Sequence, residues 1–160
     1  MNNKICYTPI GIIHSPFQKI AGVPIQPSGA IGIRGSIELH KKYSGGLKDI
    51  DGFSHIILIY NFHLSSKFSL KVIPFMENME RGIFATRSPA RPNAIGISIV
   101  RLLNVEKNIL HIEDVDIVDG TSLLDIKPFY PKFDNRTTDK VGWLSGKENL
   151  NEIRSDNRFK

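Results

Sequence analysis

Two arginines lie in a stretch rich in proline, residues 85–93, whose residue types are those of an anion-binding loop. Pro89 and Pro92 fix the backbone φ angle and donate no amide hydrogen bond, so we predict a loop rather than a helix or a central strand. Arg87 and Arg91 each present a planar fork of donors that suits a carboxylate or a phosphate. The residues leave two interpretations open: a ligand-binding loop, or a structural turn whose arginines pair with surface acids.

An acidic and a basic side chain alternate with apolar ones at the end of a second stretch, residues 122–127. On a strand, Leu124 and Ile126 would share one face, and Asp125 and Lys127 would share the other. The carboxylate could accept hydrogen bonds from ribose hydroxyls or an amino group, and the ammonium could neutralise an anion. The pair could equally be a surface ion pair, which contributes about 0–1 kcal/mol.

His55 lies near the start of an apolar stretch, residues 53–62, and His63 directly follows its end. The two histidines are eight residues apart, so on a regular strand they share a face. A histidine beside a buried strand is usually structural, but a neutral imidazole also accepts a proton at physiological pH. We therefore take His63, at the far end of the stretch, as a candidate catalytic base, and His55 as structural.

The five histidines show no paired ligand spacing and Cys6 is the single cysteine, so we expect no metal site and no internal disulfide.

The elements that must position these residues are predicted to be short strands. Apolar residues alternate within residues 31–39 at Ile31, Ile33, Ile37 and Leu39, and within residues 94–103 at Ile95, Ile97 and Ile99. Residues 53–62 are nearly all apolar, as in a strand covered on both faces. Turns at 106–108 and 119–120 suggest hairpins. We predict an all-β fold, a mainly antiparallel β-barrel with a few short helices.

Helical patterns are weak and are confined to residues 40–50, 70–79 and 149–158. After Asp134 the chain becomes polar, so we assign residues 1–134 to the barrel domain and residues 135–160 to a C-terminal tail or arm of the same domain. No nucleotide-binding fingerprint follows a strand and opens a helix, which leaves a Rossmann-type enzyme unsupported.

Composition narrows the choice of partner and compartment. The chain has 160 residues, of which 41% are hydrophobic, and carries a net charge of +5 that is concentrated in residues 1–100. A basic surface suits an anionic partner such as RNA. No apolar run approaches the roughly 20 residues that span a bilayer, and no apolar leader is visible. We therefore expect a cytoplasmic protein with no membrane association.

Several segments in sequence order carry a family resemblance: PIGIIHSPF (9–17), GVP-I-Q (22–26), DGFSHIILIYNFH (51–63), GIFATRSPARPNAIGISIVRLL (82–103) and VDIVDGTSLLDIKPFYP (115–131). Together they resemble the TsaA/TrmO-like family. The resemblance implies a β-barrel methyltransferase that uses S-adenosyl-L-methionine, acts as a homodimer and methylates N6 of threonylcarbamoyladenosine beside the anticodon of tRNA. Two alternatives are a methyltransferase for another RNA or a small molecule, and a non-catalytic module that binds S-adenosyl-L-methionine or nucleotides.

The resemblance also implies site residues. Cofactor contacts are expected at Pro24, Ile25, Gln26, His63, Leu64, Arg87, Ile97, Leu124, Asp125, Ile126 and Lys127. Arg91 and Asn93 are the candidates for RNA contact. The chain departs from the family pattern at Ile25, where an arginine is usual, at Ala90, where a histidine or aromatic residue is common, and at Ala94, where a proline is usual.

Overall fold

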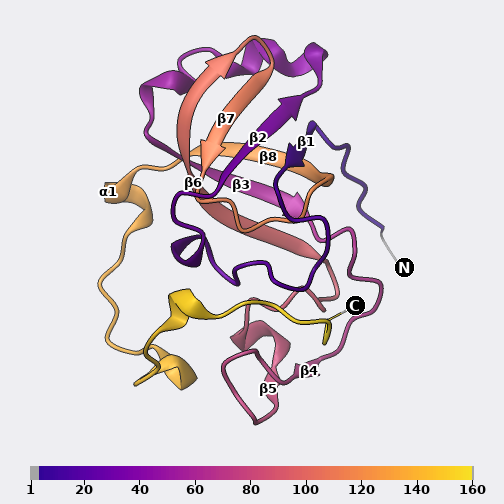
Figure 1. The fold of residues 1–160 in the computed structure, drawn as a ribbon, viewed down its shortest axis with the longest axis vertical. Helices are drawn as coiled ribbons and strands as arrows, with labels where there is room; N and C mark the ends of the chain where they lie inside the picture. Colours follow the sequence, from indigo (N-terminus) through magenta and orange to yellow (C-terminus); the bar gives the residue numbers. More distant parts are fainter. Residues whose placement is uncertain (1–3, 160) are drawn as a thin grey trace.

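The computed structural model describes residues 4–159. Six strands close into an antiparallel barrel in the order β1-β2-β7-β6-β3-β8 (Figure 1). They are β1 (Gly11–His14), β2 (Arg34–Leu39), β3 (His55–Asn61), β6 (Ile95–Glu106), β7 (Ile109–Glu113) and β8 (Thr121–Pro128). A separate pair, β4 (Lys71–Val72) and β5 (Arg81–Gly82), lies beyond one end of the barrel. The predicted all-β, mainly antiparallel barrel is confirmed.

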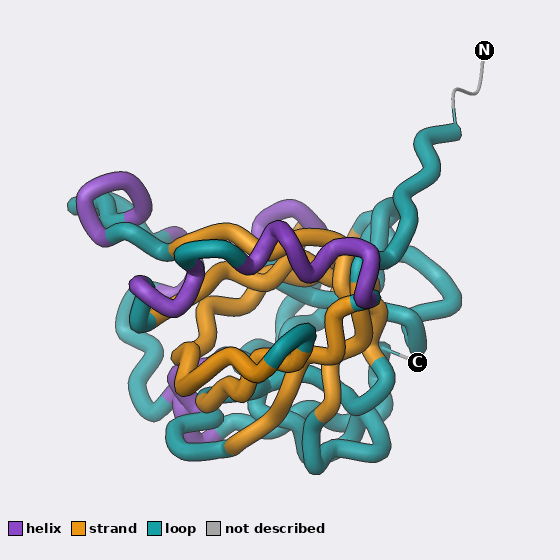
Figure 2. Tube along the Cα trace, turned by 90° about the horizontal axis from the view of Figure 1, so that it is seen from above, coloured by secondary structure: helices purple, strands orange, loops and turns teal. Residues whose placement is uncertain are grey.

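The helical segments are short and lie outside the barrel wall (Figure 2). They are α1 (Pro131–Asp134) and the 3₁₀ turns η1 (Pro27–Gly29), η2 (Lys41–Leu47), η3 (Ile50–Gly52), η4 (Ile83–Ala85), η5 (Gly142–Leu144) and η6 (Leu150–Glu152). The helix predicted within 40–50 is present as η2 and the start of η3. The helix predicted at 70–79 is wrong, because β4 occupies its start and Pro74 follows. The helix predicted at 149–158 is reduced to η6.

Branched aliphatic side chains fill the barrel interior. Those with no measurable exposure include Ile13, Ile37, Ile56, Leu58, Val100, Leu110, Ile112 and Leu123. Along β3, Ile56, Leu58 and Tyr60 point inward, whereas the outward residues between them keep part of their surface exposed. The prediction that both faces of this strand are covered therefore holds fully only for the inner face.

Two predicted turns are confirmed. The β6–β7 hairpin turns at Lys107, whose φ is 59°, and the Asn108 side chain donates a hydrogen bond to the Leu39 carbonyl on the neighbouring strand. Gly120 adopts a φ of 76°, a left-handed conformation that glycine tolerates without strain. This turn delivers the chain into β8.

The predicted shared face of residues 31–39 is confirmed for Ile37 and Leu39, which are buried, and is wrong for Ile31; the isoleucines of β6 do not face the core either. Ile31 is 78% exposed and precedes the strand, because Gly32 turns the chain and its amide donates to the Asp114 carboxylate. In β6, Ile95, Ile97 and Ile99 point outward and are 43%, 54% and 40% exposed. The inward residues are smaller at one end of β6, where Gly96 lies opposite Tyr60. A side chain at Gly96 would overlap the Tyr60 ring, so the bulk that fills this part of the barrel comes from β3.

The C-terminal segment returns to the body of the protein beside residues 20–26 (Figure 1). Ser155 forms backbone hydrogen bonds of 2.8 Å with both Gly22 and Val23, and Pro24 pairs with Arg154 in an isolated antiparallel bridge. Phe159 is buried in a second apolar cluster near β4. Residues 4–9, in contrast, extend away from the barrel (Figure 2). Within the described chain, no helix has both the length and the apolar character needed to span a membrane.

Candidate functional site

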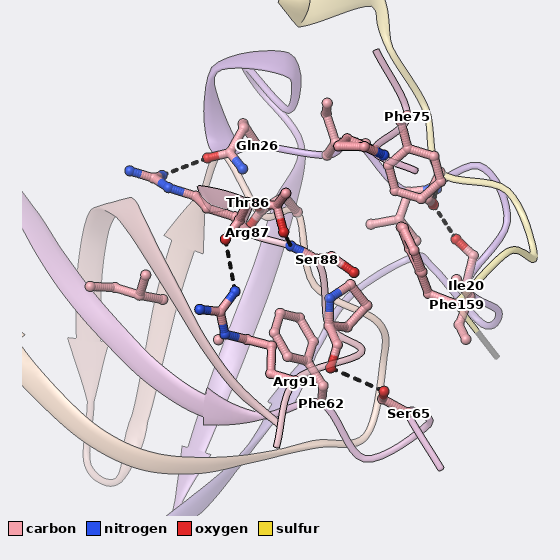
Figure 3. Close-up of a pocket in the computed structure, with 18 of the residues that line it drawn as sticks. Ile20, Gln26, Phe62, Ser65, Phe75, Thr86, Arg87, Ser88, Arg91 and Phe159 are labelled. Atoms are coloured by element: carbon pink, nitrogen blue, oxygen red, sulfur yellow. Dashed lines mark hydrogen bonds between the residues drawn. The ribbon is translucent and has the colours of Figure 1, made fainter. Parts of the chain in front are cut away.

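A cavity of about 730 Å³ lies at the end of the barrel where five loop regions and the C-terminal segment meet (Figure 3). This volume falls within the range of about 300–1,000 Å³ that is usual for small-molecule sites. Its walls come from residues 20–26, from the end of β3 and the loop after it, from residues 74–76, from residues 84–97, from residues 116–121 and from residues 143–159. Residues far apart in the sequence therefore converge on one site.

Arg87 and Gln26 connect two of these loops across the mouth of the cavity. The Arg87 Nη1 atom donates to Gln26 Oε1 at 2.8 Å (Figure 3). Arg87 is exposed and lines the cavity, and its positive charge acts on the nearby Asp116 without forming an ion pair with it. The ligand-binding interpretation of the 85–93 loop fits Arg87, because this side chain has no carboxylate partner among the described residues.

Arg91 has a different setting in the same loop. Its Nη1 atom donates to the carbonyl oxygens of Thr86 at 2.7 Å and Ile83 at 3.2 Å, and its guanidinium lies 5.8 Å from the centre of the Phe84 ring. These contacts hold the loop in shape. The structural interpretation therefore fits Arg91, while its contact with RNA stays a prediction.

A polar chain runs from the buried Tyr60 and Ser98 in the barrel interior to the partly buried Asp116 at the cavity. The Tyr60 hydroxyl lies 3.0 Å from Ser98 Oγ, and Ser98 Oγ donates to Asp116 Oδ1 at 2.6 Å. Tyr60 and Asp116 both line the cavity. Because the serine proton goes to the carboxylate, the tyrosine is the donor to the serine. The three side chains form a directed network that ends at a carboxylate.

Burial governs the ionisation of this network. It raises the pKa of Asp116 to about 6, against the opposing effects of the Ser98 hydrogen bond and the positive charge of Arg87. Burial also raises the pKa of Tyr60, and the neighbouring Asp116 charge adds to that rise. A carboxyl group with a raised pKa beside a cavity is a feature of sites that transfer protons.

Aromatic side chains make up much of the rest of the cavity wall. Phe62, Phe75, Phe84, Trp143 and Phe159 all line it. Trp143 is fixed by a hydrogen bond of 2.7 Å from its indole nitrogen to the Ala85 carbonyl. Aromatic faces attract cations and stack on planar rings. The cavity thus offers surfaces for a flat ring or a cationic group, and separate polar groups for anions.

The structure brings most of the predicted cofactor residues together. Pro24, Ile25, Gln26, His63, Leu64, Arg87 and Ile97 all line the cavity, as does Arg91. His63 is exposed at the rim, and its Nδ1 atom lies 3.3 Å from Thr121 Oγ1. Asn93 is exposed and lies outside the cavity lining.

The four predicted residues of β8, Leu124 to Lys127, do not line this cavity. Asp125 and Lys127 form an ion pair of 2.7 Å on the outer surface of the barrel. The predicted shared face of Asp125 and Lys127 is confirmed. The register of β8 shifts opposite Ile59 and Tyr60, so the alternation predicted for this strand is wrong at Leu124. Ile126 packs against the core, and it shares that side with Leu123 rather than with Leu124.

Sequence reasoning missed two parts of the site. The first is the Tyr60–Ser98–Asp116 network, for which the only sequence signal is an acidic residue between the apolar residues Val115 and Ile117. The second is the C-terminal wall, where Trp143 and Phe159 are large apolar residues in an otherwise polar segment. Such residues in a polar segment indicate that it packs against something.

Comparison with known proteins identifies relatives of this chain. Residues 12–135 match the family model described as the tRNA-methyltransferase O N-terminal domain. A protein of Pyrococcus abyssi named "Probable S-adenosyl-L-methionine-binding protein" is 56% identical over 97% of this chain and 85% of its own length. The human tRNA (adenine(37)-N6)-methyltransferase is 33% identical over 79% of this chain and 30% of its own length.

Solved structures of similar fold also include members of this family. The crystal structure of TrmO from Pseudomonas aeruginosa superposes with a TM-score of 0.74 and 34% identity, covering 88% of this chain. The match covers 63% of that TrmO chain, so the present chain spans less than two thirds of its length.

Proposed function

Since the chain belongs to the tRNA-methyltransferase O N-terminal domain family, we propose that it is an S-adenosyl-L-methionine-dependent methyltransferase that acts on tRNA. The observation that carries the proposal is the convergence of seven predicted cofactor residues on one cavity. They come from three separate segments of the sequence, and the barrel places them on one site. A relative that is 56% identical over 156 aligned residues carries a name that refers to S-adenosyl-L-methionine binding.

The residues around the cavity fit this cofactor, which supplies an activated methyl group when it is bound. Arg87 would pair with its carboxylate, because a guanidinium binds a carboxylate through two parallel hydrogen bonds. The aromatic wall, including Phe62 and Phe84, suits the adenine ring and the sulfonium charge. The protein itself supplies orientation and electrostatics.

We propose N6 of threonylcarbamoyladenosine, beside the anticodon, as the methyl acceptor. The human relative is named for methylation at N6 of adenine 37 in tRNA. An anticodon loop presents unstacked bases and dense phosphates, which a basic protein surface attracts. The enzyme would act in the cytoplasm. Mass spectrometry of tRNA nucleosides from cells with and without the gene tests this proposal, and the methylated nucleoside should vanish when the gene is deleted.

We also propose that the enzyme is a homodimer, joined through the outer face of β8, β3 and β6. Strand register places Asp125, Ile59 and Ile97 side by side in one row, and Lys127, Ile57 and Ile99 in the next. The middle and one edge of this face are apolar, and the other edge carries the Asp125–Lys127 ion pair. The apolar edge is continuous with the cavity, because Ile95 and Ile97 belong to both.

A two-fold arrangement on this face would complete the site. If β3 lies near the axis, the β8 edge of each copy meets the β6 edge of the other. The Asp125 and Lys127 side chains of a second copy would then approach the cavity at Ile97. The proposal accounts for the separation of these predicted cofactor residues from the others within one chain.

A further inference from the structure

Asp116 has the position of a functional carboxylate rather than that of a structural ion-pair partner. Its neighbours Val115 and Ile117 are buried in the barrel core, which fixes the backbone on both sides. Its side chain lines the cavity, and Ser98 is the single side chain of the described residues recorded as donating to it. The hydrogen bond engages Oδ1. The carboxylate also accepts from its own backbone amide. A carboxylate has about four acceptor positions, so others can still serve a ligand in the cavity.

We propose that Asp116 is the general base of the methyl transfer and takes the proton from N6 of the acceptor base. The inference rests on the proposed function and adds the identity of the proton acceptor. In the reaction, the N6 nitrogen forms a bond to the methyl carbon, and the carbon–sulfur bond breaks with its electron pair remaining on sulfur. The N6 proton passes to the Asp116 carboxylate, which becomes a neutral carboxylic acid. Charge and atoms balance with no further reactant.

The proposed substrate needs a base. N6 of threonylcarbamoyladenosine is bonded to a carbonyl carbon and to the purine ring, and both withdraw its lone pair. Such a nitrogen becomes a competent nucleophile as its proton is removed. A positioned base of this kind accelerates proton transfer by about 10²–10⁴-fold.

The network behind Asp116 suits this role. Ser98 donates its single proton to the carboxylate, and Tyr60 donates to Ser98, so both hydroxyls hold the carboxylate in one orientation. Arg87 contributes positive charge from the loop, and its charge favours the ionised carboxylate. Burial sets the pKa of Asp116 near 6, so the group is ionised at neutral pH yet basic enough to accept a proton.

His63 is the alternative proton acceptor, and its surroundings suit the task less well. It is exposed at the rim of the cavity, and its Nδ1 atom faces the Thr121 hydroxyl. That hydroxyl already donates to the Val118 carbonyl at 2.6 Å, so it cannot also give its proton to the imidazole. Nδ1 would therefore be the donor to Thr121. Nε2 would then be the acceptor nitrogen of an exposed side chain, with no buried hydrogen-bond network behind it like that of Asp116.

The first test uses three variants of the full chain: Asp116→Asn, His63→Gln and the control Asp114→Asn. Asp114 belongs to the same segment but bonds the Gly32 amide outside the cavity. Single-turnover methyl transfer to tRNA bearing threonylcarbamoyladenosine is measured from pH 5 to 9 with saturating cofactor. The wild-type rate should rise with pH up to about 6 and then level off. Asp116→Asn should lower the plateau by about 100-fold or more, with Asp114→Asn unchanged.

The second test needs no turnover. Calorimetry should give Asp116→Asn a dissociation constant for S-adenosyl-L-methionine within about threefold of the wild-type value.

A carbon-13 NMR titration should show a carboxyl group with a pKa near 6 in the wild type. Its signal should be absent from Asp116→Asn and should titrate at higher pH in Ser98→Ala. The upward shift is expected because Ser98 stabilises the ionised form.

Each contrary outcome has its own meaning. A wild-type chain that binds the cofactor but methylates no tRNA overturns the proposed function and the assigned base together. A wild-type chain that methylates tRNA while Asp116→Asn does so equally fast overturns the base alone. Loss of the pH dependence in His63→Gln would transfer the role to His63. A weaker cofactor affinity with an unchanged saturated rate in Asp116→Asn would make Asp116 a cofactor ligand instead.

Discussion

Arg87 and Arg91 lie four residues apart in one loop, yet their guanidinium groups have different partners. Arg87 contacts Gln26 at the mouth of the cavity, whereas Arg91 binds backbone carbonyl groups of its own loop. The sequence predicted that the loop would present arginines, because two prolines stiffen it. It could not separate their roles, since these depend on where each side chain points after the barrel has formed.

We predict that Arg87→Ala and Arg91→Ala have separable effects. Arg87→Ala should weaken S-adenosyl-L-methionine binding by about tenfold or more, because a hydrogen bond to a charged group contributes about 1.5–3 kcal/mol. Arg91→Ala should instead lower the thermal unfolding midpoint, because it leaves the Thr86 and Ile83 carbonyls without this donor. Calorimetry and thermal unfolding of both variants check this. Equal loss of affinity in the two would contradict the assignment.

Asp116 also affects stability in a pH-dependent way. Its pKa in the folded protein is about 6, above the reference value of 3.8, so folding favours the protonated form. The stability from this preference is fully present below pH 3.8 and is lost as the pH rises through 6. The free energy of unfolding of the wild type should therefore fall between pH 4 and pH 7 relative to that of Asp116→Asn, which cannot ionise at this position. Urea unfolding at both pH values measures the difference, and a loss in Asp116→Asn relative to the wild type would contradict it.

Among the strands, β3 and β6 illustrate what sequence patterns predict and what they miss. The existence of β3 followed from its nearly continuous apolar run, and that of β6 from its apolar alternation and from the turn that closes the β6–β7 hairpin. The inward face of β6 did not, because its isoleucines suggest a core face while Gly96 and Ser98 occupy inward positions. The reason is reciprocal packing, since Tyr60 of β3 fills the space that Gly96 leaves. A pattern along one strand carries no information about its neighbour.

Gly96→Ala tests this packing. The new methyl group would overlap the Tyr60 ring and also approach Phe62, so the ring must move away from Ser98. We expect a destabilisation of about 1–3 kcal/mol, as for an overpacked core, and a lower methyl-transfer rate. Gly45→Ala serves as the control, because its methyl group would meet open space. Wild-type stability in Gly96→Ala would show that the ring is not held as described.

Across the whole molecule, the C-terminal segment and the outer face of the barrel determine how complete the site is. The segment closes one side of the cavity through Trp143 and Phe159, although its composition predicts little structure. Its packing depends on contacts with residues more than a hundred positions away, such as Ser155 with Val23. Local patterns do not show contacts at this separation. The apolar outer face of β3 and β6 is likewise visible only once the barrel has closed.

The proposed dimer can be tested on this face. Light scattering should give a mass of twice 18.0 kDa for the wild type. Ile59→Arg should yield a monomer, because dimerisation would bury an unpaired charge at the centre of the interface. The monomer should bind S-adenosyl-L-methionine more weakly, because the second copy no longer completes the site. Ile109→Arg is the matched control, since Ile109 is 37% exposed on β7, outside this face. A wild-type monomer with full cofactor affinity would refute the shared site.

The most direct test of the proposed function is transfer of a labelled methyl group from S-adenosyl-L-methionine to defined tRNA. Two otherwise identical tRNAs are compared, one bearing threonylcarbamoyladenosine beside the anticodon and one with unmodified adenosine there. We predict one methyl group per molecule on the first tRNA, located on N6 by mass spectrometry, and none on the second. Equal transfer to both, or no transfer to either despite tight cofactor binding, would contradict the account.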